Sequence, residues 1–164
     1  MSIGAFDLTI RGGRISNADA SLHADIGVVD GRISAVGPNL PAGKRDVDAS
    51  DHWVLPGGID SHCHIEQLSG MGLMCADDFY SGTVSAAFGG TTTILSFAAQ
   101  HRGDRIPDVV ASYGALAREK AVIDYGFHLI LTNPDESALR EHLPQVIRDG
   151  ITSLKVYMTY DALR

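Results

Sequence analysis

The chain has 164 residues, of which 45% are hydrophobic and 20% charged, with a formal net charge of −7. This composition is typical of a globular protein with one substantial core, and the acidic balance argues against a nucleic-acid partner. No stretch approaches the roughly 18 apolar residues of a membrane helix, and no secretory signal begins the chain. We therefore expect a cytoplasmic protein, in which Cys63 and Cys75 form no disulfide framework.

Residues 1–55 contain short β-like runs separated by turn signals. Strands are expected at Phe6–Ile10, Asp25–Val29 and Arg32–Val36. The last two flank Asp30-Gly31, a dipeptide that favours a tight hairpin because both residues tolerate positive φ. Val54 and Leu55 close this part before a Pro-Gly-Gly sequence.

From residue 56 onward, strands and helices alternate at a spacing typical of a parallel sheet built from βαβ units. Such units build either an open sheet or a closed barrel, and a complete eight-unit barrel takes roughly 250 residues. Residues 56–164 have room for about four units, so we expect the chain to be part of a larger protein. Because one flank of a four-unit sheet would be unpaired, we expect residues 1–164 expressed alone to be insoluble or molten. The expected strands are Ile59–Ile65, Thr91–Phe97, Tyr125–Thr132 and Ile151–Met158, and the expected helices are Asp77–Phe88, Ile106–Lys120 and Pro134–Arg148.

The sequence Asp60-Ser-His-Cys-His64 is the sharpest local feature. In a strand Asp60, His62 and His64 would project to one side, where two imidazoles can reach the same divalent cation and the carboxylate can orient one of them. The alternative is two surface or core histidines beside a turn. Cys63 would lie on the opposite face as a small buried residue and not a ligand.

Lys155 lies in the middle of an otherwise apolar expected strand. Burial favours the neutral amine, which can add carbon dioxide and become a carbamate, an anionic ligand able to bridge two cations. The alternative is a lysine paired with a buried acid from a neighbouring strand. The strand alone favours the second interpretation.

Together, the stretches PGGIDSHCH and SLKVYMTY resemble the amidohydrolase superfamily, and within it the dihydropyrimidinase and D-hydantoinase family. DYGFH at residues 124–128 and VDGRISAVG at residues 29–37 are also similar to that family. The resemblance implies an α/β fold: residues 1–55 as part of an N-terminal β-sandwich, and residues 56–164 as the first half of a TIM-type (β/α) barrel. The full-length family member is usually a tetramer.

The resemblance also implies a binuclear site with two divalent cations, most simply Zn²⁺, held by His62, His64 and carboxylated Lys155. Tyr160 would donate a hydrogen bond to the substrate oxygen as negative charge develops. The implied reaction is hydrolysis of a dihydropyrimidine, hydantoin or related cyclic imide to an N-carbamoyl amino acid. Two further histidines and an aspartate that serves as general base are not in this chain, which alone is then expected to be inactive.

Several alternatives stay open at this stage. An allantoinase or dihydroorotase, a non-enzymatic relative, or an inactive fragment would share much of the pattern. His128 is expected to be a core or strand histidine, and Gln100 with His101 either lines the pocket or lies in a solvated loop. The apolar segment from Leu68 to Phe79 is expected to follow the first barrel strand, where the family contacts the ring substituent.

Overall fold

The computed structural model describes residues 5–158. The chain divides into two compact units, Met1–Pro56 and Gly57–Arg164. This division falls one residue after the boundary expected from the sequence. No helix in residues 5–158 is both long and apolar enough to cross a membrane.

The first unit is a sheet in which β1 (Phe6–Ser16) is the central strand. It pairs with β2 (Ser21–Val29) in antiparallel fashion and with β4 (Gly43–Asp48) and β5 (Trp53–Val54) in parallel, while β3 (Arg32–Gly37) pairs with β2. The expected hairpin is confirmed, since Asp30 and Gly31 have φ of 49° and 71°. Strand β4 was not expected from the sequence, because four of its six residues are charged.

A carboxylate holds the bulged part of β1 to the rest of this sheet. Asp25, 8% exposed, accepts hydrogen bonds from the backbone N–H groups of Gly12 (2.8 Å) and Leu40 (3.1 Å), and pairs with Arg11. Removing the carboxylate would leave two backbone donors without a partner, which costs about 1–3 kcal/mol each.

We therefore expect Asp25→Ala to lower the local stability of the first unit by about 2 kcal/mol, or roughly 30-fold in the hydrogen-exchange protection of the Gly12 and Leu40 amides. Peptide-resolved exchange of the full-length protein measures this loss. Asp19→Ala, at an exposed turn position, is the matched control. Equal protection in both variants would show that Asp25 does not hold the bulge.

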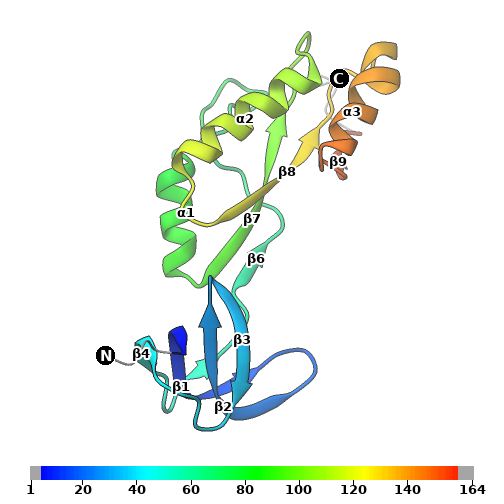
Figure 1. Cartoon of the computed structure of the whole chain (residues 1–164). Coiled ribbons are helices and arrows are strands. Elements are labelled where there is room, and N and C mark those ends of the chain that lie inside the picture. Colours follow the sequence, from blue (N-terminus) through cyan, green and yellow to red (C-terminus); the bar gives the residue numbers. More distant parts are fainter. Residues whose placement is uncertain (1–4, 159–164) are drawn as a thin grey trace. The chain divides into compact units, whose positions relative to one another are not determined.

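The second unit contains a four-stranded, fully parallel sheet in the order β6-β7-β8-β9 (Figure 1). Helices α1 and α2 cover one face, on which Phe79, Ile94 and Ala117 form a buried cluster. The bounds are β6 Gly58–Asp60, α1 Phe79–Phe88, β7 Thr91–Ala99, α2 Ile106–Lys120, β8 Asp124–Ile130, the π-helix η1 Ala138–His142, α3 Leu143–Arg148 and β9 Leu154–Lys155.

The parallel sheet and its alternation with helices are confirmed, but three predicted elements were wrong in extent. The expected helix at 134–148 begins at Glu136 and is not regular. Because Pro144 lacks the N–H that a regular α-helix requires, a wide turn with a Leu143 N–H to Ala138 carbonyl bond precedes α3. The expected strand 151–158 pairs with β8 only at Leu154 and Lys155. The expected strand 59–65 ends at Asp60.

Candidate metal centre and adjoining pocket

The segment that carries the two histidines leaves the sheet directly after β6. The Asp60 carboxylate accepts a hydrogen bond from the backbone N–H of His62 (3.0 Å), which turns the chain away from the sheet. His62 and His64 therefore lie beyond the strand, and the expectation that strand alternation brings them together was wrong. Their rings are nevertheless neighbours, with centroids 5.5 Å apart.

Phe97 of β7 is the centre of the cluster. The His62 and His64 rings each lie 4.7 Å from its ring, the His128 ring lies 5.0 Å away, and the Lys155 amine lies 4.6 Å from the ring centroid. Phe97 is 2% exposed, so its ring is held in place by packing and gives the four polar groups around it a common surface to contact. The face of the sheet opposite α1 and α2 thus brings together the imidazole pair and the lysine that the sequence singled out.

Lys155 differs from its expected environment in one respect. It is half-buried and not enclosed, because β9 is only two residues long. Within residues 5–158 no acidic side chain forms an ion pair with its amine. Its neighbours are the aromatic rings of Phe97 and Tyr157.

His64 has a partner that the sequence analysis missed. Its Nδ1 lies 2.7 Å from Oε1 of Gln67, which is 7% exposed. A carbonyl oxygen only accepts, so Nδ1 carries the proton and Nε2 presents its lone pair. This is the arrangement by which proteins orient a metal-binding imidazole. The three-residue spacing of His64 and Gln67 across a turn gave no recognisable signal.

The loop that carries Gln67 is anchored to both covering helices. Glu66 adopts a positive φ of 48° and its carboxylate accepts from the backbone N–H of Phe79 (3.1 Å), at the start of α1. The same carboxylate pairs with Lys120 at the end of α2. The hydrogen bond to Glu66 is the main reason that the pKa of Lys120 is raised. The loop that follows the histidines is therefore held at its base.

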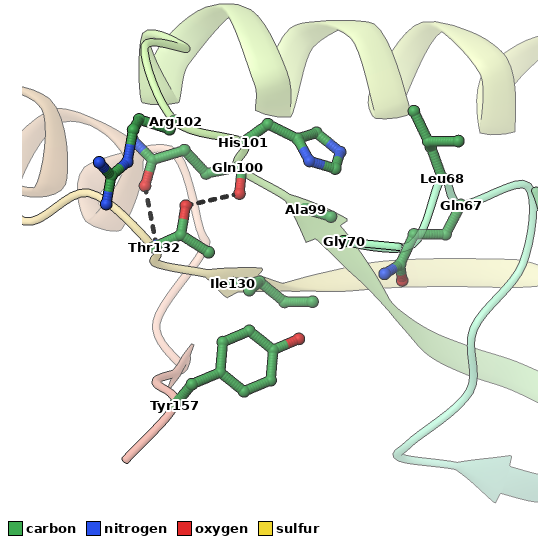
Figure 2. Close-up of a pocket in the computed structure, with 10 residues that line it drawn as sticks. All are labelled: Gln67, Leu68, Gly70, Ala99, Gln100, His101, Arg102, Ile130, Thr132 and Tyr157. Atoms are coloured by element: carbon green, nitrogen blue, oxygen red, sulfur yellow. Dashed lines mark hydrogen bonds between the residues drawn. The ribbon is translucent and has the colours of Figure 1, made fainter. Parts of the chain in front are cut away.

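The structure has a pocket of about 200 Å³, and Figure 2 shows the residues that line it. Gln67, the partner of His64, and Tyr157, the neighbour of Lys155, both line it. Gln100 and His101 also line it, whereas the sequence favoured a solvated loop for them. Gln100 is 2% exposed and joins the ends of β7 and β8, since its side-chain oxygen accepts from the backbone N–H of Thr132 (3.1 Å).

Cys63, between the two histidines, is unsuited to bind a cation. Burial raises the pKa of its thiol to about 11, and the negative charge of Asp60 adds to that shift. Its Sγ lies 3.7 Å from the Leu95 carbonyl, on the β7 side of the segment. Cys63 was expected to be a small buried residue, and the structure shows it half-buried.

We expect Cys63 to alkylate slowly. At pH 8 a thiol of pKa about 11 is roughly 0.1% thiolate, some 200-fold below an ordinary cysteine, and its higher nucleophilicity recovers about tenfold of this. Iodoacetamide should modify Cys63 at least about 20-fold more slowly than free cysteine, with the rate still rising with pH between 8 and 10. Peptide mass spectrometry follows this rate. Rapid labelling at neutral pH would contradict the buried, neutral thiol.

Tyr160, the predicted hydrogen-bond donor to the substrate, lies outside the described residues. Among residues 5–158, no three His, Cys, Asp or Glu side chains are arranged so that they could hold a metal ion.

Comparison with solved structures shows the same fold in D-hydantoinase. One such structure superimposes with a TM-score of 0.90 at 42% sequence identity, over 95% of this chain and 34% of that one. In fold, the described residues are like part of a hydantoinase.

The sequence comparisons agree, although no family model matches the chain. The D-hydantoinase of Ralstonia pickettii is 43% identical over 155 residues, which is 94% of this chain. The dihydropyrimidinase of Rattus norvegicus is 37% identical over 163 residues, which is 95% of this chain. The resemblance to the dihydropyrimidinase and D-hydantoinase family is therefore confirmed. The chain spans about a third of these relatives, 33% and 31% of their lengths.

Proposed function

We propose that the protein carrying this chain hydrolyses a cyclic amide, a hydantoin or dihydropyrimidine, to an N-carbamoyl amino acid. The observation that carries the proposal is the gathering of His62, His64 and Lys155 around the Phe97 ring, next to a pocket. The relatives named D-hydantoinase and dihydropyrimidinase support the choice of substrate class.

The donor set fits a pair of divalent cations, most simply Zn²⁺. Two imidazoles are typical zinc ligands, and His64 already has the second hydrogen bond that fixes its tautomer. Lys155 would join them after its neutral amine adds CO₂ and releases a proton, which yields a carbamate with two ligand oxygens. When bound, such cations lower the pKa of a water molecule and polarise a carbonyl oxygen.

The residues of this chain then position the site and the substrate. Asp60 holds the backbone turn that presents His62, and Gln67 holds the ring of His64. We assign the adjoining pocket to the substrate ring, and Tyr160 to the developing negative charge on the attacked carbonyl oxygen, where one positioned donor contributes about 3–4 kcal/mol. The further histidines and the aspartate base would come from residues beyond these 164.

The proposal includes an architecture for the complete protein. The parallel sheet β6–β9 would be the first half of a TIM-type (β/α) barrel, a fold whose active sites lie at the carboxyl ends of the strands. The first unit would belong to a β-sandwich. The full-length protein would be a cytoplasmic homotetramer, as members of the family usually are tetramers.

A substrate panel tests the proposed reaction. Full-length protein is incubated with hydantoin, dihydrouracil, allantoin and dihydroorotate, with and without prior chelator treatment, and the ring-opened products are measured. We expect hydantoin or dihydrouracil to be opened, with loss of activity after chelation and recovery with Zn²⁺. Opening of allantoin or dihydroorotate alone would assign the protein to another class of ring hydrolase, and chelator-resistant activity would contradict the metal mechanism.

A further inference from the structure

His128 of β8 links the two parts of the candidate metal centre. Its Nε2 lies 2.9 Å from the backbone carbonyl oxygen of Ser61, the residue before His62. Its Nδ1 contacts Oγ of Ser153, two residues before Lys155. A single imidazole thus reaches the segments that carry both kinds of predicted ligand.

The strand order makes this link more than a local contact. Ser61 follows β6 and Ser153 precedes β9, and these strands are the two edges of the described sheet. Among the described strands, the backbone ladders connect β6 to β9 only through β7 and β8. The His128 ring passes over Phe97, its register partner in β7, and joins the two edges through side-chain bonds.

The hydrogen-bonding partners define one tautomer. A backbone carbonyl only accepts, so Nε2 carries the proton and donates it to Ser61. Nδ1 then holds the lone pair and accepts the hydroxyl hydrogen of Ser153. Both ring nitrogens of the neutral imidazole are therefore used, and neither is left for a cation.

We propose that His128 is a positioning residue that sets the separation between the His62–His64 pair and Lys155. The inference rests on the proposed function, because it assumes that these three residues share a cation pair. His128 lies in strand β8, as expected for a core or strand histidine, and the inference adds a role to that position. Partners one step removed from metal ligands commonly change metal affinity by about 10- to 100-fold.

The test compares metal affinity in full-length variants by competition with a chelator, and records the absorption spectrum of the Co²⁺-substituted protein. We expect His128→Ala to weaken metal binding about 10- to 100-fold and to change the Co²⁺ spectrum. His128→Gln, which keeps an N–H donor in reach of Ser61, should restore part of that affinity. Ser153→Ala, which removes the donor to Nδ1, should give a smaller loss of affinity.

Leu129→Ala is the matched control for a purely structural effect. Leu129 is the next residue in β8, fully buried on the opposite face against the α3 side of the core. Its substitution should lower the melting temperature and leave metal affinity and the Co²⁺ spectrum unchanged. Equal affinity in wild type and His128→Ala would overturn the inference, as would the same affinity loss in Leu129→Ala.

Lys155→Ala separates this result from failure of the proposed function. If Lys155→Ala loses metal while His128→Ala binds as wild type does, the metal centre stands and the role of His128 is wrong. If Lys155→Ala itself binds metal normally, the proposed metal centre is wrong, and with it the basis for a positioning role.

Discussion

Replacing Lys155 by alanine in the full-length protein is expected to abolish binding of at least one of two cations and to reduce ring hydrolysis at least about 1,000-fold. The lysine lies over the same Phe97 ring as both histidines, with no acid paired to its amine among the described residues. Loss of a bridging ligand removes several kcal/mol of transition-state stabilisation, and about 4 kcal/mol corresponds to this factor. Metal analysis by mass spectrometry and a hydrolysis assay measure the two effects.

Formation of the proposed carbamate on Lys155 requires CO₂, which gives a second, independent test of the metal centre. Metal-free wild-type protein reconstituted in CO₂-free buffer should bind less than its full complement of Zn²⁺, and added bicarbonate should restore it. His62→Ala should lose metal under both conditions. Lys44→Ala, which removes an amine paired with Asp7 in the first unit, is the matched lysine control and should bind metal as wild type does. Unchanged zinc content and hydrolysis in both Lys155→Ala and His62→Ala would reject the site.

Replacing Phe97 by alanine is expected to destabilise the protein by about 3–5 kcal/mol and to remove metal binding as well. Phe97 is 2% exposed and packs with Ala99 and Ile130 on the face of the sheet that carries the cluster. Its ring also contacts the imidazoles and the amine, so a cavity at this position would free all of them to move. Denaturant unfolding and chelator competition measure the two effects.

Phe97→Leu keeps much of the volume and should cost less stability, yet it lacks the flat ring against which the polar groups rest. We expect Phe97→Leu to weaken metal binding more than a substitution elsewhere in the core that lowers the free energy of unfolding by the same amount. Leu129→Ala, buried on the opposite face of the same sheet, should lose about 2–5 kcal/mol with normal metal affinity. Normal metal affinity in Phe97→Ala would show that the ring is only part of the core.

Local patterns predicted much of the second unit because each element has its own signal. The run Thr91–Phe97 is β-branched and apolar, as a strand buried on both faces must be, and it lies within β7. Helix α2 begins and ends where its apolar periodicity does, with Pro107 in the first turn. By contrast, β9 has only two paired residues, and its extent depends on a neighbour that the sequence pattern does not specify.

The grouping of His62, His64 and Lys155 was expected from the family resemblance of the stretches that carry them, because neither stretch alone favoured a metal site. The turn at Asp60, the Gln67 partner of His64 and the His128 bridge were missed. Each depends on a contact between segments far apart in the chain or across an irregular turn, such as His128 with Ser61, 67 residues away. The periodicity of a sequence shows which side chains lie on the same face of a helix or strand, and it carries no information on contacts between distant segments.

Gln67 belongs both to the wall of the pocket and to the support of His64. Any molecule in the pocket that competes for its amide therefore alters the hydrogen bond that orients this imidazole. Thermodynamic reciprocity requires that the cation and such a molecule change each other's affinity by the same factor. Occupancy of the proposed metal centre and of the pocket would then be a coupled equilibrium, in which the choice of ring and the retention of metal are adjusted through Gln67.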